Sequence, residues 1–311
     1  SAEEVDRARY HTLRGLVRLR QGDNAGAAEA LEKAIQARRA RPGEERTADD
    51  TRSLRLAHLY LAQAEYRRGN HRAALAALDS AGPVADEIAS IHALRAQAHW
   101  KLGQRVEAFA ALNRGESRFP QDPQFRRRKV FYLIELGFYR RAAEVGQAYL
   151  DRGKASPDDY LAIGNALRKS EQYRAALGIL ERARLQYPRN RKIALELAHV
   201  YLDQGSTGLA ADLFAEAAVY HPEIRSEAAE LQRRAGRLYR ALMLNAGIRD
   251  QEKKLKQRLA IFIAMERWEQ AASMGDALRR QRLLDNGDIR YAHAYALFKS
   301  GEYDEADRML S

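Results

Sequence analysis

Residues 159–188 read DYLAIGNALRKSEQYRAALGILERARLQYP, and this stretch decides the fold. Apolar residues recur at intervals of three and four on both sides of a polar break at Glu171, which is the spacing of amphipathic helices. Pro188 closes the stretch at a point where a helix cannot continue. The stretch therefore predicts two antiparallel helices that are joined by a tight turn.

The same pattern returns along the chain, mostly with a period of 34 residues. Its turn positions are Gly22, Gly69, Gly103, Gly137, Glu171, Gly205, Glu266 and Gly301. Five residues after each turn position stands an alanine: Ala27, Ala74, Ala108, Ala142, Ala176, Ala210, Ala271 and Ala306. One hairpin cannot bury its own apolar face, so a repeated hairpin predicts a stack of neighbours.

Further columns support this repeat. Seven residues before the turn position the residue is usually small: Gly15, Ala62, Ala96, Gly164, Ala198 and Ala294. Nine residues after it a large apolar residue is common: Leu31, Leu78, Leu112, Leu180, Phe214 and Leu310. Small residues allow two helix backbones to cross closely, and the large residues fill the space beside them.

These columns resemble the tetratricopeptide repeat over most of residues 8–222 and again over about 252–311. The resemblance implies an all-α, right-handed α-α superhelix, a solenoid of antiparallel helix pairs whose concave side is lined mainly by the first helix of each pair. The fourth repeat departs from the pattern, because Gly146 and Tyr149 replace its usual large and small residues.

Two breaks in the period define the expected domain organisation. Residues 1–223 are predicted as an array of about six repeats, with a charged loop insertion at 38–50. Residues 224–250 are predicted as an irregular helix or a degenerate repeat, and 251–311 as a pair of repeats of which the last is truncated. We therefore expect a segment of a longer protein.

Composition limits the function. The 311 residues include 53 Lys and Arg against 42 Asp and Glu, a net charge of +11, so an acidic partner is favoured. No apolar run is long enough to span a membrane, and no Cys is present for disulfides or thiol catalysis. The location is unknown from these data, with a periplasmic one slightly favoured.

The sequence contains little that indicates catalysis. No zinc-protease, dinucleotide, phosphate-loop or nucleophile-elbow motif is present, so we expect no enzyme activity, cofactor or metal. His92 and His99 are seven residues apart and could share a metal, but both fall on inward-packing columns, which favours core histidines. The acid pairs at 49–50 and 158–159 precede helices, where they are expected to cap them.

Three basic runs, at 126–129, 253–258 and 279–282, raise the question of nucleic acid. Adjacent residues on a helix point in different directions, so each run spreads around its helix instead of forming one stripe. Nucleic acid would require the charges to follow one groove with stacking aromatic residues between them. Solvated helix faces are the favoured interpretation.

The resemblance also implies which residues face the groove: those two, three, six and ten before each turn position. The candidate ligand-binding residues are Gln63, Tyr66, Arg67, Gln97, Trp100, Lys101, Arg127, Phe131, Asn165, Arg168 and Lys169. Amides can bond an extended backbone or sugar hydroxyls, cations can hold carboxylates, and aromatic rings supply flat apolar contact. The lysine–asparagine clamp of some relatives is absent, because Leu161 stands at the lysine position beside Asn165.

Two functions follow from these residues. The first is a non-catalytic scaffold that binds an extended acidic protein segment in a basic concave groove. The second is the periplasmic part of a bacterial exopolysaccharide export protein, which would bind polysaccharide or its modifying enzymes. The sequence does not discriminate between a peptide and a polysaccharide ligand.

Overall fold

The computed structural model describes residues 2–40, 48–151, 155–284 and 287–310. Within them it contains eighteen α-helices and no strand. The helices of the first half are α1 (Ala2–Gln21), α2 (Asn24–Arg39), α3 (Ala48–Arg67), α4 (His71–Ala81), α5 (Ala89–Lys101), α6 (Arg105–Arg118), α7 (Gln124–Glu135) and α8 (Tyr139–Leu150). Those of the second half are α9 (Pro157–Lys169), α10 (Tyr173–Gln186), α11 (Arg191–Asp203), α12 (Thr207–Tyr220), α13 (Arg225–Arg234), α14 (Leu238–Ala246), α15 (Gln251–Ala264), α16 (Trp268–Arg280), α17 (Gly287–Ser300) and α18 (Tyr303–Leu310).

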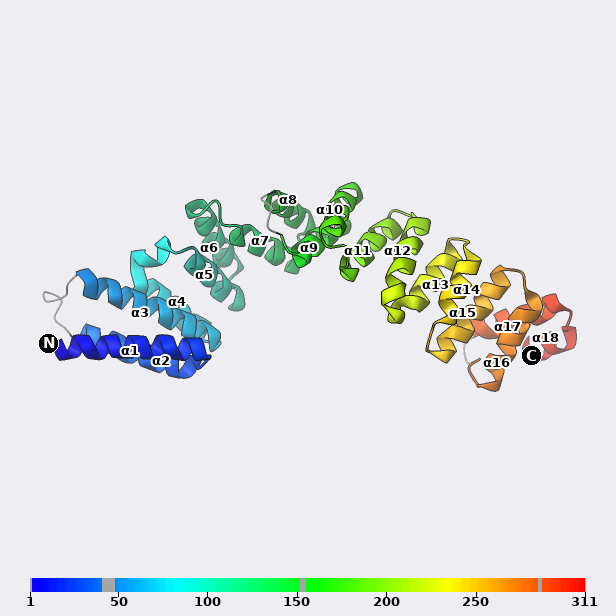
Figure 1. The fold of residues 1–311 in the computed structure, drawn as a ribbon, viewed down its shortest axis with the longest axis horizontal. Coiled ribbons are helices and arrows are strands. Elements are labelled where there is room, and N and C mark those ends of the chain that lie inside the picture. Colours follow the sequence, from blue (N-terminus) through cyan, green and yellow to red (C-terminus); the bar gives the residue numbers. More distant parts are fainter. Residues whose placement is uncertain (1, 41–47, 152–154, 285–286, 311) are drawn as a thin grey trace. The chain divides into compact units, whose positions relative to one another are not determined.

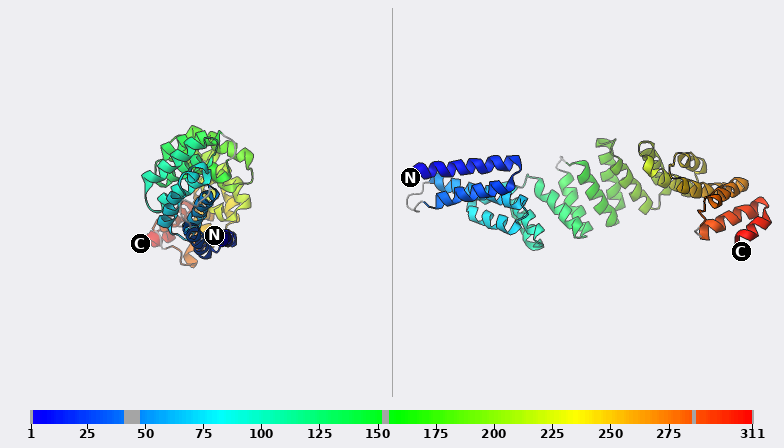
Figure 2. Two further views of the ribbon diagram at one scale, coloured as in Figure 1. Left: turned by 90° about the vertical axis from the view of Figure 1, so that its left-hand side faces the viewer. Right: turned by 90° about the horizontal axis from the view of Figure 1, so that it is seen from below.

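The chain folds as two compact units, residues 1–153 and 154–311. In each unit, consecutive helices pair as antiparallel hairpins, and each hairpin packs on the next along the chain (Figure 1). The pairing of α1 with α2, and the packing of α3 against them, can be followed in the views of Figure 2. The all-α solenoid predicted from the repeats is confirmed.

Every predicted turn position adopts a left-handed backbone. The φ angles run from 56° at Glu266 to 90° at Gly301. This conformation ends a helix and reverses the chain, and glycine adopts it without the clash that a Cβ brings. Glu171 and Glu266 adopt it despite their side chains, with φ of 62° and 56°.

Residues 224–250 contain two helices, α13 and α14, where the sequence predicted one irregular helix or a degenerate repeat. The turn between them lies at Gly236, whose φ is 74°. Ala229 stands seven residues before it and Ala241 five after it, and both are fully buried. The segment is therefore one more hairpin of the array, shortened so that successive turn positions are 31 and 30 residues apart.

The core lies between the helices of each hairpin and between neighbouring hairpins. All eight predicted column alanines are buried, with at most 4% exposure. The small residues beside them allow close contact: a Cβ added at Gly164 would lie 2.7 Å from Cδ2 of Leu180. Leu310 is the exception among the large column residues, because it is exposed.

The predicted insertion at 38–50 falls mainly outside the described residues, since α2 reaches Arg39 and α3 begins at Ala48. The predicted boundaries at 223 and 250 fall inside the second unit, where α12 to α15 pack in order. Among the helices of the described ranges, none is long and apolar enough to cross a membrane.

Candidate ligand-binding pocket

A polar pocket of about 420 Å³ opens on the first unit. Four helices contribute to it: α3, α5, α6 and α7. Its lining residues are Tyr66, Gln97, Trp100, Lys101, Arg105, Arg128, Tyr132 and Glu135. Three of the four helices are the first helices of their hairpins, so the repeat itself brings these side chains to one place.

A stack of three flat groups forms the floor of this pocket. The rings of Trp100 and Tyr132 lie 3.7 Å apart at 5° to one another. On Trp100 the guanidinium carbon of Arg105 lies 3.8 Å from the ring centre, and Arg105 Nη1 donates to the Trp100 carbonyl at 2.7 Å. Cation–π contact and this hydrogen bond hold Arg105 in place. Burial raises the pKa of Tyr132, so its hydroxyl stays protonated.

The indole of Trp100 is also fixed by a hydrogen bond. Its Nε1 donates to Oε2 of Glu135 at 3.1 Å. Across the pocket, the hydroxyl of Tyr66 donates to Oε1 of Gln97 at 3.3 Å. The polar groups are therefore pre-ordered, which lowers the entropic cost of holding a ligand.

The pocket carries an excess of positive charge. Lys101, Arg105 and Arg128 line it against one carboxylate, that of Glu135. Within the described part of the chain, no carboxylate oxygen lies within 4 Å of these three cations. The Nε of Arg128 is buried and has no acceptor among the described residues. The three cations that line the pocket are therefore not neutralised by carboxylates of the described chain.

The structure brings four of the predicted groove residues into this pocket: Tyr66, Gln97, Trp100 and Lys101. Gln63 is half-buried on α3, outside the lining. Arg67 donates to the carbonyl of Leu19 at 3.2 Å instead of facing the pocket.

The remaining predicted residue pair of the first unit lies on α7. The guanidinium carbon of Arg127 lies 5.1 Å from the ring centre of Phe131, and neither residue lines the pocket. Arg127 is exposed while its guanidinium lies over the ring of Phe131. Arg127 and Phe131 therefore form a surface feature separate from the pocket.

In the second unit two of the predicted groove residues, Asn165 and Arg168, bind carboxylates of the next hairpin. Arg168 donates to Glu196 and to Asp203, each at 2.8 Å, and the amide of Asn165 donates to Glu196 at 3.1 Å. Burial alone would lower the pKa of Arg168, but the bonds to Asp203 and Glu196 raise it. Lys169 is exposed at the end of α9. The charge of Arg168 is therefore already neutralised within the repeat array.

Four pocket residues are absent from the predicted set: Arg105, Arg128, Tyr132 and Glu135, of which Glu135 stands in a groove column, two residues before Gly137. Arg105 begins the second helix of its hairpin, and Arg128 and Tyr132 stand nine and five residues before Gly137, outside the columns considered. A repeat pattern can predict a stacked pair only when positions of adjacent repeats are compared with one another. Here the pair is Trp100 of one repeat and Tyr132 of the next.

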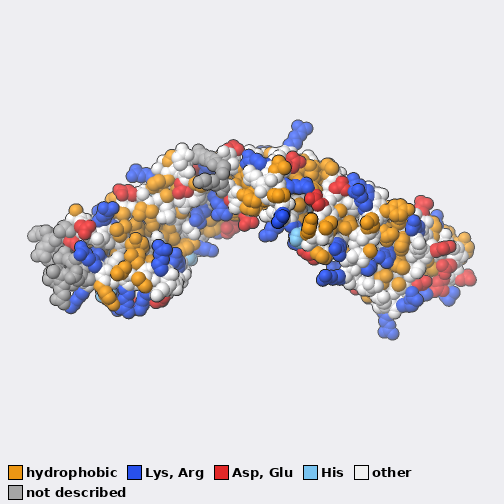
Figure 3. Space-filling model, in the orientation of Figure 1, with side chains coloured by type: hydrophobic (Ala, Val, Ile, Leu, Met, Phe, Trp, Pro, Cys, Tyr) orange, Lys and Arg blue, Asp and Glu red, His pale blue; other side chains and the backbone are white. Residues whose placement is uncertain are grey.

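The other basic and histidine features find internal partners. Arg126 and Lys129 both bind Glu116, at 2.6 and 2.5 Å. On the face drawn in Figure 3, Lys and Arg side chains lie in separate patches with acidic and apolar side chains between them. His92 contacts the carbonyl of Asp86 at 3.2 Å, and His99 contacts Gln104 at 2.7 Å, so the two histidines do not share a ligand.

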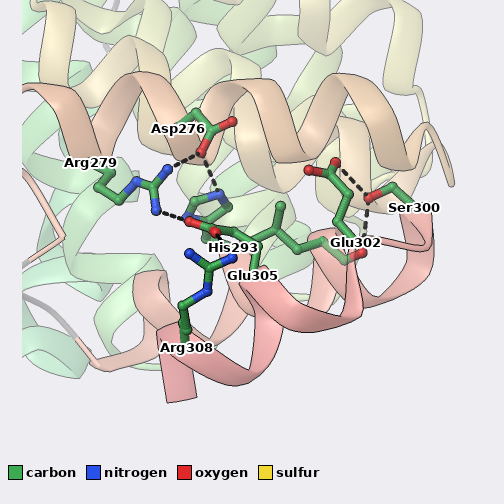
Figure 4. A network of polar contacts seen from close by, with 8 residues as sticks. Asp276, Arg279, His293, Ser300, Glu302, Glu305 and Arg308 are labelled. Carbon is green, nitrogen blue, oxygen red and sulfur yellow. Dashed lines mark hydrogen bonds and ion pairs between the residues drawn. The ribbon is translucent and has the colours of Figure 1, made fainter. Parts of the chain in front are cut away.

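A polar network joins α16, α17 and α18 in the second unit (Figure 4). Arg279 bridges Asp276 and Glu305, and His293 lies fully buried with Nε2 at 3.4 Å from Oδ1 of Asp276. Burial lowers the pKa of His293, and the carboxylate of Asp276 offsets this only in part. Neither here nor elsewhere in the described ranges do three metal-binding side chains converge.

Repeated antiparallel hairpins, each packed on the next within its unit, define a helical-repeat solenoid. The family model "Tetratricopeptide repeat" matches residues 2–45 and 161–229. These two stretches therefore match the tetratricopeptide repeat, and the fold of the described residues is the helical-hairpin array of that repeat. Proteins of this family are in general non-catalytic scaffolds for protein partners.

Solved structures share this fold at low sequence identity. A tetratricopeptide repeat protein from Parabacteroides merdae is 16% identical with a TM-score of 0.53, covering 94% of this chain and 99% of that chain. The C-terminal part of a repeat-containing protein from Cytophaga hutchinsonii is 13% identical with a TM-score of 0.60, covering 92% and 98%. Naa15/Naa10 bound to HypK-THB is 14% identical with a TM-score of 0.60, covering 81% of this chain and 42% of that chain. No curated protein sequence matches the chain.

Proposed function

We propose that this protein is a non-catalytic scaffold that holds an extended acidic segment of a partner protein in the pocket of its first unit. The observation that carries the proposal is the convergence of Lys101, Arg105 and Arg128 on one pocket, without internal carboxylate partners among the described residues. Arg168 gives the contrast, since its carboxylate partners come from the next repeat.

A carboxylate in this pocket would receive charge-assisted hydrogen bonds from Lys101, Arg105 and Arg128. The fork of a guanidinium matches the two oxygens of a carboxylate, and such bonds are about twice as strong as neutral ones. Gln97 and Tyr66 add amide and hydroxyl groups for the backbone of an extended chain. Flanking acidic residues gain from the net charge of +11, which raises the association rate at low salt.

The test is binding of a fluorescent decaglutamate peptide, followed by anisotropy at 0.15 M salt. Lys101→Glu with Arg128→Glu is expected to weaken binding by about tenfold or more, since two charge-assisted contacts are lost. The matched control is Arg114→Glu with Arg118→Glu, which reverses two exposed cations of α6 outside the pocket and is expected to change affinity by less than about twofold. Equal weakening in the control would show attraction to net charge alone and would refute the pocket.

A second probe in the same experiment separates peptide from polysaccharide. A fluorescent oligogalacturonate carries a comparable density of carboxylates on a sugar backbone. Weaker binding of the oligogalacturonate than of decaglutamate is the result expected for a protein ligand. Tighter binding of the oligogalacturonate, lost in Lys101→Glu with Arg128→Glu, would instead support a periplasmic polysaccharide-binding role.

A further inference from the structure

A second exposed surface, in the other unit, is lined by aromatic and cationic side chains that the pocket does not use. We call it the aromatic track, and it consists of Tyr239, Arg267, Trp268, Tyr291, Tyr295 and Lys299. Tyr239, Tyr291 and Tyr295 expose 67%, 64% and 36% of their surface. Single exposed rings are common on protein surfaces, but exposed rings that contact one another form a contiguous apolar patch, which indicates a binding surface.

The track consists of two groups of contacting side chains, drawn from three hairpins, that meet at the consecutive residues Arg267 and Trp268. Arg267 donates to the Tyr239 hydroxyl at 3.2 Å, and the next residue, Trp268, packs edge to face on Tyr295 at 5.7 Å. Tyr295 stacks with Tyr291 at 6.4 Å and 11°. The Nζ of Lys299 lies 5.6 Å from the ring of Trp268 and 5.7 Å from that of Tyr295.

Tyr239, Trp268 and Tyr295 each contact a residue outside their own helix, and Tyr291 contacts Tyr295 on the same helix. Tyr291, Tyr295 and Lys299 stand ten, six and two residues before Gly301 on α17, whereas Trp268 begins α16 and Tyr239 belongs to α14. The repeat fixes the spacing between the helices, so the rings are already ordered before a ligand binds. Binding therefore costs little side-chain entropy.

We propose that the aromatic track binds a proline-rich segment of a partner protein in the polyproline II conformation, with an acidic residue beside the prolines. Pyrrolidine rings are flat and apolar and pack on aromatic faces, and the polyproline II helix is already extended before it binds. Its carbonyl groups have no internal partners and accept hydrogen bonds. Within the described residues, the indole N–H of Trp268 has no acceptor and is free to donate to them.

The charges of the track decide between this ligand and the alternatives. Arg267 and Lys299 both lie over rings, where an ammonium or guanidinium retains N–H groups for one carboxylate. Two cations are too few to follow the phosphates of a nucleic acid strand.

The experiment compares two fluorescent peptides with equal charge, (Pro-Pro-Glu)₄ and (Gly-Ser-Glu)₄, by anisotropy on the full chain. We expect the proline peptide to bind about tenfold more tightly or better, since the rings distinguish it and its entropy cost is smaller. Trp268→Ala with Tyr295→Ala is expected to abolish the difference. Tyr295→Phe is expected to retain it, which separates loss of the ring from loss of the hydroxyl.

Two controls keep the result specific. Tyr220→Ala removes a ring that is 79% exposed in the same unit but lies outside the track, and should leave both affinities unchanged. Lys101→Glu with Arg128→Glu should also retain the preference for proline, so this result is independent of the pocket. Equal binding of the two peptides, no binding, or tighter binding of cellohexaose or oligothymidylate would overturn the proposal, and circular dichroism confirms that each variant is folded.

Discussion

One chemical change, glycine to alanine, is expected to have opposite effects at two exposed sites of the second unit. Gly205 is a turn position with φ of 80°, whereas Gly178 lies inside α10. At neither site would a new Cβ meet an atom within 4 Å. Packing is therefore constant between the two variants, and only the backbone conformation differs.

The magnitudes follow from the backbone. At Gly205 a Cβ in the left-handed region destabilises the folded state by about 1–2 kcal/mol. Alanine also lowers the conformational entropy of the unfolded chain, which offsets about 0.4–1 kcal/mol of that loss. Gly205→Ala should thus lower the free energy of unfolding by about 1 kcal/mol. Gly178→Ala should raise it by about 1 kcal/mol, because alanine is the better helix former.

The assay is urea unfolding followed by circular dichroism at 222 nm for both variants and the parent chain. The midpoints should move in opposite directions around the parent midpoint, with unchanged slopes. A repeat array can unfold in stages, so the decisive result is the sign of each shift instead of its size. Shifts in the same direction would refute the role assigned to the turn positions.

Three further predictions concern stability. Gly164→Ala should destabilise by about 1–3 kcal/mol through contact with Leu180, and Leu180→Val in the same chain should restore part of the loss in urea unfolding. Glu171→Gly should raise the urea midpoint, because it relieves a left-handed glutamate with φ of 62°, and an unchanged or lower midpoint would contradict this. Burial lowers the pKa of His293 below its ordinary value of 6.5, so the unfolded chain binds more protons and stability should fall as the pH drops below about 6.5. His293→Gln should reduce that loss between pH 7.5 and 5.5, and an identical pH dependence in the variant would contradict it.

The sequence predicted the hairpin array because the relevant physics is local. The end of a helix at a left-handed residue and the alanine at the helix crossing five residues later are both local features. Each is determined by residues within one or two helical turns of each other. The turn position can be recognised from the repeat even where glutamate replaces glycine, as at Glu171. For residues 224–250 the sequence left an irregular helix and a degenerate repeat open, because the spacings of 31 and 30 residues around Gly236 depart from the period, although the alanine columns are intact.

The candidate site needed the tertiary structure, because charge neutralisation occurs between residues far apart in sequence. Arg168 and Arg105 both occupy polar stretches near a turn position, yet Arg168 meets Glu196 of the next repeat, and Arg105 instead lies on Trp100. Packing of adjacent hairpins decides which cations retain free donors. The sequence by itself determined the helices, their turns and the buried columns, which short-range backbone geometry dictates. Which side chains meet across hairpins, as Trp100 meets Tyr132, was decided only by the tertiary structure, because those contacts depend on the exact offset of one hairpin against the next.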